Sequence, residues 1–465
     1  MTRPYELVLR QAQLLDGTVA DIGIRDGRIA AIAATLGAGD DEIECQRQLL
    51  LPGLHDHHIH LLATAARMQS VDLSGITDAD AIAISLREAA AGTGAGTWVR
   101  ATGYDERAAG LPDRHRIDAW ITDRPVRIQD RTGALWLLNS AALARIGDAP
   151  WPDAVETDGD GSPTGRIWRG DDWLRERIGS QPPSLAPLSR QLLRWGVTAV
   201  TDAGARNGPD EAALLSAAIG DGHLLQRLTM MGREDLPGGD GYRMGPVKLL
   251  FDERDLPDLA TIAARIEAAR ALRRNVAAHC VTSAELLSFL AALDMAGGSQ
   301  PGDRIEHGSV IPHCLLKDIA RSGLTVVANP GFIARRGDRY LAEVDPLDLP
   351  DLQRLASLQA AGIPVMAGSD APYGPTNPWV AIRAAIDRRT PAGQVLGLRE
   401  GIDLAAALRL FYPPDGIAKG AVADCLLMQP DWQQRLRADQ DPDPVAMTIM
   451  AAHVADPQPT GAHNA

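Results

Sequence analysis

Short apolar runs alternate with amphipathic segments along most of the chain. Each run is typical of a buried strand, and segments between the later runs, such as 259–274, have apolar residues at helical spacing. The runs are 49–54 (LLLPGL), 197–204 (VTAVTDAG), 227–232 (RLTMMG), 246–253 (PVKLLFDE), 275–281 (NVAAHCV), 303–310 (DRIEHGSV), 324–331 (LTVVANPG) and 363–372 (IPVMAGSDAP). Strands that alternate with helices indicate a parallel sheet, and eight such units predict an α/β fold, a closed (β/α)8 TIM barrel.

An open, doubly wound sheet is the alternative fold for this alternating pattern. Such a sheet would need a glycine-rich phosphate loop after its first strand, and the sequence has none there. The barrel is therefore the preferred interpretation, and we place it at residues 52–407.

The gap between the first two strands, 62–190, is too long for a barrel loop. It contains strand-like pieces (WVRATGY and PVRIQD), a helix-like piece (NSAALARI) and six of the nine tryptophans. We expect an inserted subdomain over the C-terminal mouth of the barrel. Most of its tryptophans should pack its own core, and one or two could line a substrate pocket.

Both chain ends have a β character. Residues 20–33 form a strand–turn–strand pattern, and 416–428 and 445–454 are again short β segments. We expect residues 1–51 and 408–455 to form one composite β-sandwich beside the barrel.

Composition and charge narrow the function. The formal net charge of −14 argues against nucleic-acid and anionic-membrane partners, and no apolar stretch approaches the length of a membrane span. The four cysteines are scattered without metal-ligand or disulfide spacing, which favours a reducing, cytoplasmic setting. A small-molecule substrate and a homo-oligomer, guessed to be a dimer, are the expected partners.

Candidate metal ligands fall at the ends of the predicted strands. His58 and His60 follow the first run; in a strand, side chains two apart share a face, so the pair is half of a site for a divalent ion such as zinc. The others are Lys248, His279, His307 and Asp370. Since barrel active sites lie at the C-terminal strand ends, all six should meet at one rim. A bound ion would lower the pKa of water towards 7, and Asp370 is the natural carboxylate to take its proton.

Lysine is rare in this chain. Only Lys248, Lys317 and Lys419 stand among 46 basic residues, so Lys248 is kept where a guanidinium cannot substitute. A desolvated, neutral amine can react with carbon dioxide and present a carbamate to two ions. The alternative is a buried ion pair between Lys248 and Asp252 or Glu253.

These motifs together resemble the amidohydrolase superfamily, in the amidohydrolase family 3 branch that includes N-substituted formamide deformylases. The matching pieces are PGLHDHHIH, VKLLFDE, VAAHCVT, DRIEHGSV, AGSDAPYGP and GIAKGAVADCLLM, with DGDGSPTGRI and LLNSAAL in the insert. The resemblance implies that His58 and His60 hold one ion, that His279 and His307 hold another, and that carboxylated Lys248 bridges them. It also implies that Asp370 is both ligand and proton shuttle, and that zinc, or else manganese, iron or cobalt, is the metal. His55 and His57 fall outside the pattern and are interpreted as supporting or structural residues.

Substrate contacts are harder to assign. Arg335 and Arg336, after the seventh strand, could clamp a carboxylate through their two-pronged donors, although such pairs are more often solvated. Tyr104 and Trp168 in the insert are further candidates, and the loop 372–375 could wall the pocket.

The expected function is metal-dependent hydrolysis of an amide-type C–N bond in a formamide, another N-acyl compound or a cyclic amide. A lactone or ester hydrolase with the same centre remains an alternative. A non-catalytic barrel that binds a ligand is a third possibility, but it should show gaps in the ligand set, and none of the six positions is degraded.

Overall fold

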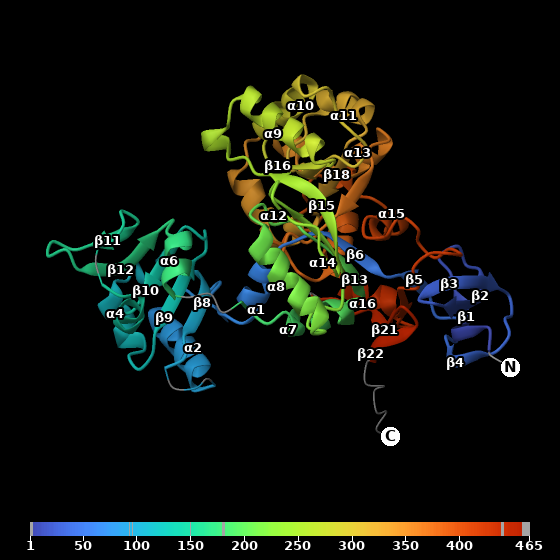
Figure 1. The fold of residues 1–465 in the computed structure, drawn as a ribbon, viewed down its shortest axis with the longest axis horizontal. Coiled ribbons are helices and arrows are strands. Elements are labelled where there is room, and N and C mark those ends of the chain that lie inside the picture. Colours follow the sequence, from blue (N-terminus) through green and yellow to red (C-terminus); the bar gives the residue numbers. More distant parts are fainter. Residues whose placement is uncertain are drawn as a thin grey trace. The chain divides into compact units, whose positions relative to one another are not determined.

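The computed structural model describes residues 3–457 except 93, 95, 149, 179–181 and 439–440. The chain divides into two compact units (Figure 1). The first contains the barrel and both chain ends, and the second is Leu62–Ser184. No described helix is long and apolar enough to cross a membrane.

Eight parallel strands pair in chain order to form the barrel. They are β6 (Leu54–Ile59), β13 (Val197–Asp202), β14 (Arg227–Gly232), β15 (Tyr242–Leu249), β16 (Val276–Cys280), β17 (Arg304–His307), β18 (Thr325–Ala328) and β19 (Val365–Ala367). The sheet closes where the Asp370 N–H donates to the His58 carbonyl (2.7 Å) and the His60 N–H donates to the Ala371 carbonyl (2.9 Å). The predicted (β/α)8 barrel is confirmed.

Helices surround the strands and bury one face against them. They are α7 (Ala186–Arg194), α8 (Pro209–Gly220), α9 (Leu259–Ala271), α10 (Ser283–Met295), α11 (Leu316–Ser322), α12 (Gly331–Glu343), α13 (Ala356–Ala360), α14 (Pro378–Asp387) and α15 (Leu404–Arg409), whereas α1 (Leu61–Met68) lies, except for its first residue, in the second unit. Helix α10 shows why they form: Thr282 and Glu285 make a reciprocal capping box, and Leu286 and Phe289 pack in the core with Ile305 of β17. The strand residues that point outward thus pack against the helices in the hydrophobic core. The residues that point into the barrel can therefore be polar.

The chain ends form two four-stranded sheets with a shared core. One contains β1 (Tyr5–Gln13), β2 (Val19–Arg25), β3 (Arg28–Ala33) and β4 (Gly39–Glu44), and the other β5 (Leu50–Pro52), β20 (Cys425–Met428), β21 (Val445–Met450) and β22 (His453–Pro457). The predicted sandwich from both ends is confirmed. The run 49–54 is not one barrel strand, however, because β5 pairs with β20 and the barrel strand begins only at Leu54, after Gly53. A Cβ on Gly53 would lie 2.2 Å from Thr198 Oγ1, so only glycine fits at this change of sheet.

The second unit is built on a six-stranded sheet. Its strands are β7 (Val71–Asp72), β8 (Val99–Tyr104), β9 (Val126–Asp130), β10 (Leu135–Leu138), β11 (Val155–Thr157) and β12 (Pro163–Trp168), and its helices are α2 (Ala79–Ala91), α3 (Glu106–Ala109), α4 (Arg114–Trp120), α5 (Ser140–Ile146) and α6 (Asp171–Ile178). Leu137 packs in one core cluster and Trp136 in another, as strand alternation requires. Helix α7 belongs to the first unit, where Leu193 O accepts from Thr448 Oγ1 (2.7 Å).

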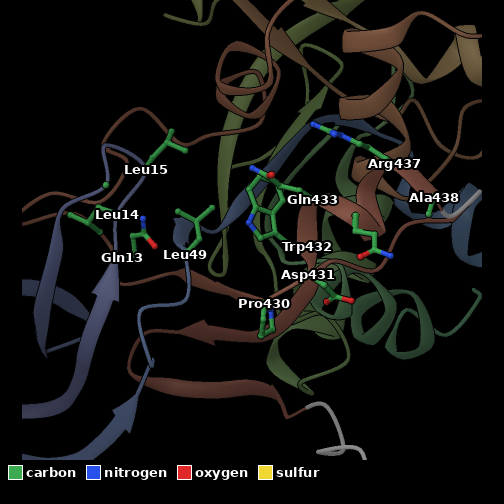
Figure 2. A pocket seen from close by; sticks show the side chains of 12 residues that line it. Gln13, Leu14, Leu15, Leu49, Pro430, Asp431, Trp432, Gln433, Arg437 and Ala438 are labelled. Carbon is green, nitrogen blue, oxygen red and sulfur yellow. The ribbon is translucent and has the colours of Figure 1, made fainter.

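A surface cavity of about 850 Å³ lies between the N-terminal strands and α16 (Trp432–Ala438). In Figure 2, Leu14, Leu15 and Leu49 lie opposite Trp432 and Arg437. None of the described residues that line this cavity belongs to the predicted ligand set.

Candidate metal centre

His58, His60 and Asp370 form a compact group of potential ligands. One ligand atom of each lies within 4.8 Å of the others. Asp370 Oδ1 lies 3.1 Å from His60 Nε2 and 3.4 Å from His58 Nε2. The group sits at the closing seam of the barrel, where the end of β6 meets the segment after β19.

His279 and His307, the other two predicted histidine ligands, lie near this group. The His307 ring centroid lies 4.7 Å from that of His58 and 4.6 Å from that of His279. His307 Nδ1 lies 2.8 Å from Asn329 Oδ1, which leaves Nε2 as the ligand atom. The four predicted histidine ligands therefore lie side by side at the strand ends.

Lys248 lies inside the barrel with its side chain 2% exposed. Its Nζ has no hydrogen-bond partner among the described residues, and the facing carboxylate, Glu306 Oε2, is 4.0 Å away. Burial lowers the pKa of Lys248, which favours the neutral amine. The alternative, an ion pair of Lys248 with Asp252 or Glu253, is not found among the described residues: the carboxylate that faces Lys248 is Glu306, and the Asp252 carboxylate accepts from the Arg254 N–H.

Glu306 was not identified from the sequence, although it immediately precedes His307. It is fully buried, contacts His58 Nδ1, and accepts from Arg304 Nε (2.6 Å) and Arg304 Nη2 (3.1 Å). Burial opposes its ionisation, but Arg304, Lys248 and His58 hold the pKa of Glu306 well below its usual value. The sequence did contain a signal for Glu306. Two charged residues that are two positions apart on a buried strand, Arg304 and Glu306, must both face the barrel interior.

The protonation states of His279 and His307 suit metal binding, whereas Glu306 and Asp370 raise the pKa of His58 against the effect of burial. Burial lowers the pKa of His279 to about 4 and that of His307 well below its usual value, so both rings are neutral near pH 7. Burial disfavours the charge on Asp370, yet hydrogen bonds from His58 and His60 hold its pKa well below the usual range.

The donor set fits a divalent cation. Imidazoles with one carboxylate are ligands that zinc accepts, and the Lys248 amine near them is a buried polar atom with no hydrogen-bond partner in the described chain. His55 and His57 stack at 3.9 Å between ring centroids, and His55 Nε2 lies 2.9 Å from Thr201 Oγ1. These two residues support the interior rather than join the ligand group.

The sequence model of the amidohydrolase family matches residues 41–411. The chain belongs to the amidohydrolase family. Among its relatives, amidohydrolase YtcJ of Bacillus subtilis is 24% identical over 75% of this chain and 75% of the relative. The N-substituted formamide deformylase of Arthrobacter pascens is 23% identical over 83% of this chain and 84% of that enzyme. Membership indicates a hydrolase that uses a divalent metal, and the His58, His60 and Asp370 group could hold one.

Solved structures agree with this amidohydrolase fold. A metal-dependent hydrolase from Pyrococcus horikoshii superimposes with a TM-score of 0.73 at 18% identity, covering 93% of this chain and 99% of its own. A second, from Pyrococcus furiosus, has a TM-score of 0.70 at 21% identity and covers 87% of this chain and 92% of its own.

The suggested substrate residues of this amidohydrolase lie in different surroundings. Arg335 and Arg336 are in helix α12, not in a loop; Arg335 is exposed, and Arg336 Nη2 donates to Tyr373 O (2.9 Å). Tyr104 is buried in the core of the second unit, and its hydroxyl donates to Gly110 O (2.8 Å). Trp168 is 43% exposed on that unit.

The loop after β19 borders the ligand group. The Tyr373 ring lies edge-on to His60, with 5.8 Å between ring centroids, and Tyr373 is 54% exposed. Arg336 holds the backbone of this loop through Tyr373 O. Arg336 thus holds Tyr373 in place beside the candidate metal centre, a role that its position in the sequence did not suggest.

Proposed function

We propose that this amidohydrolase cleaves an amide-type C–N bond of a small organic molecule, such as a formamide, another N-acyl compound or a cyclic amide. The observation that carries the proposal is the compact group of His58, His60 and Asp370, with buried Lys248 and two neutral histidines beside it. The formamide deformylase that resembles most of the chain supports amides as the substrate class.

In this proposal, His58 and His60 would hold one divalent ion, and His279 and His307 would hold a second. Lys248, once carboxylated, and Asp370 would complete the set. Burial lowers the pKa of Lys248, which supports carboxylation because only the neutral amine attacks carbon dioxide. Ions held there would supply activated water and polarise the substrate carbonyl.

Asp370 is the proposed proton carrier. Its carboxylate is ionised and lies beside both His58 and His60, so it can accept a proton from the attacking water. A new C–O bond forms at the carbonyl carbon, the C–N bond breaks, and Asp370 passes the proton to the departing nitrogen. The products are a carboxylate and an amine.

The test begins with metal per chain by elemental analysis, on full-length protein made with added zinc or manganese and bicarbonate. Two ions per chain support the bridged centre, and one ion limits Lys248 to a structural role. A value near zero in folded protein contradicts the hydrolase proposal.

Turnover is then measured on N-formyl compounds, other N-acyl compounds, cyclic imides and lactones. We expect hydrolysis of at least one amide class. Hydrolysis of lactones alone would replace the amide assignment with an ester-type activity.

Asp370→Asn tests the proton carrier. The variant should keep bound metal and lose at least about a hundredfold in kcat, since general acid–base catalysis contributes roughly that much. Asp318→Asn is the control, because Asp318 is an exposed partner of Arg321. Full activity of Asp370→Asn would remove this residue from the mechanism.

A further inference from the structure

Two partly buried arginines lie side by side in the second unit. Arg100 of β8 and Arg127 of β9 are paired in register on neighbouring parallel strands. Within the described part of the chain, the Nε atoms of both are inaccessible and have no hydrogen-bond partner. Neither side chain has a carboxylate among the groups that shift its pKa. The pair is therefore a concentration of positive charge without a counter-charge from the described protein.

Aromatic rings fix the two guanidinium groups. Arg127 Cζ lies 5.9 Å from the Trp98 ring centroid and 5.8 Å from that of Trp136, and Arg100 Cζ lies 5.8 Å from Trp136. The Trp136 indole is itself held, because its Nε1–H donates to Asp171 Oδ1 (2.9 Å). The rings stabilise the cations through their faces, but they accept no N–H in the plane of the guanidinium. The Nη groups, unlike the inaccessible Nε atoms, are the in-plane donors that a ligand could reach.

A third polar group lies on the same strand. Thr102 follows Arg100 by two residues, which places it on the same face of β8. Its hydroxyl is buried and has no partner among the described residues. One hydroxyl and two guanidinium groups thus share one side of the sheet.

Burial makes this arrangement unfavourable without a ligand. It lowers the pKa of Arg100 to about 10, with the Arg127 charge acting in the same direction, and it also lowers the pKa of Arg127. With a pKa near 10, the Arg100 guanidinium still carries its charge at neutral pH, so two like charges remain together in a partly desolvated place. Buried charges in proteins are normally paired.

We propose that this face of the second unit binds a small oxyanion, a carboxylate or a phosphate, through Arg100, Arg127 and Thr102. Guanidinium forks match the paired oxygens of such a group, and the Thr102 hydroxyl donates a further hydrogen bond. The site lies wholly within the second unit, so it does not depend on the proposed hydrolase activity.

The test measures binding of inorganic phosphate and of acetate to the full-length protein. Thermal unfolding is followed in each anion, with sodium chloride at matched ionic strength as reference. We expect a saturable rise in Tm with at least one anion. Arg127→Gln should weaken its binding about tenfold or more, the equivalent of losing one charged hydrogen bond.

Arg177→Gln is the matched control. Arg177 also lies over a tryptophan, 5.7 Å from the Trp173 ring centroid, but it is exposed at the end of α6. This variant should bind the anion as the wild type does. If Arg127→Gln fails to fold, Thr102→Val, which removes only the hydroxyl, should still weaken binding several-fold.

A response to phosphate alone assigns a phosphate ligand, and a response to acetate alone assigns a carboxylate; both support the site. Two results would overturn it. One is the absence of any saturable binding. The other is unchanged binding in Arg127→Gln and Thr102→Val, which would place the anion elsewhere, as at the metal centre.

Discussion

At the scale of single residues, two predicted ligands reach the centre only because their backbones leave the strand conformation. His307 has a φ of 69° and Asp370 a φ of 49°. In β17, Ile305 packs outward in the core, so regular alternation would direct His307 outward as well. A turn in which the Gly308 N–H donates to Glu306 O (3.0 Å) redirects the chain at His307. Such a conformation costs of order 1–3 kcal/mol for a non-glycine residue, and surrounding contacts must maintain it.

Glu306 is the residue on which His58 depends for its orientation. Glu306→Gln keeps the shape but removes the charge that faces Arg304, Lys248 and His58, so we expect metal affinity to fall roughly 10–100-fold. Competition with a chelator measures that affinity independently of turnover. Glu343→Gln, which removes an exposed partner of Arg339, is the control and should bind metal normally. Equal metal affinities in Glu306→Gln and Glu343→Gln would show that metal binding does not depend on the orientation of His58 by Glu306.

Lys248→Ala tests the bridging carbamate. It should lose one or both ions, because the proposed bridge is gone, and short carboxylic acids should restore part of the metal content and activity. Elemental analysis with and without added acid gives the answer. Unchanged metal content would leave the buried amine as a structural partner of Glu306, 4.0 Å away.

At the scale of elements, the site is a property of the seam between β6 and the segment after β19. Gly368 lies where these segments are closest, and a Cβ there would fall 2.4 Å from His58 N and 2.5 Å from His58 Cβ. Asp370 is then anchored to His58 O by its own N–H. The spacing of the two segments therefore sets the separation of the ligands.

Gly368→Ala should push β6 away from this segment. We expect a loss of about 1–3 kcal/mol in the free energy of unfolding, as for other overpacked sites, together with weaker metal binding. Denaturant unfolding and chelator competition measure the two effects. Gly362→Ala is unsuitable as a control because Gly362 has a φ of 74°, whereas Gly92→Ala, with only ordinary contact at 3.7 Å, is suitable. Normal metal affinity in Gly368→Ala would show that the seam tolerates displacement.

At the scale of the whole molecule, a bound ion would join the first and last strands of the barrel. His58 lies in β6, His60 directly follows it, and Asp370 follows β19. An ion shared by the three would therefore link the first and last strands in addition to the two backbone hydrogen bonds. Ligands that bind only the folded state stabilise it by mass action.

Removal of the metal with a chelator should accordingly lower the Tm by roughly 3–8 °C. Amide hydrogen exchange should increase in β6 and in residues 368–374 before it does elsewhere in the barrel. His60→Ala, which removes one half-buried ligand, should show a smaller response to the chelator. An identical Tm with and without metal in the wild type would contradict a role for the ion in closing the barrel.

The sequence by itself determined the barrel, the sandwich from both chain ends, and the family. Strand and helix periods are local properties of the chain, and the eight apolar runs all contain or adjoin barrel strands. The sequence did not predict the change of sheet at Gly53, because one apolar run contributes to two sheets. Only the pairing partners, β20 for Leu51 and β13 for Leu54, determine the sheet to which each residue belongs.

Only the tertiary structure showed Glu306 against His58, Arg336 on the Tyr373 loop, and Arg100 beside Arg127. These contacts join residues of different elements, and residue type alone does not specify such partners. The sequence proposed a carboxylate beside Lys248 within its own segment, but the fold supplies one from a strand about sixty residues away. The predicted ligand residues can therefore be recognised from the local sequence. The side chains that orient them and shift their pKa values come from other strands and are known only from the assembled barrel.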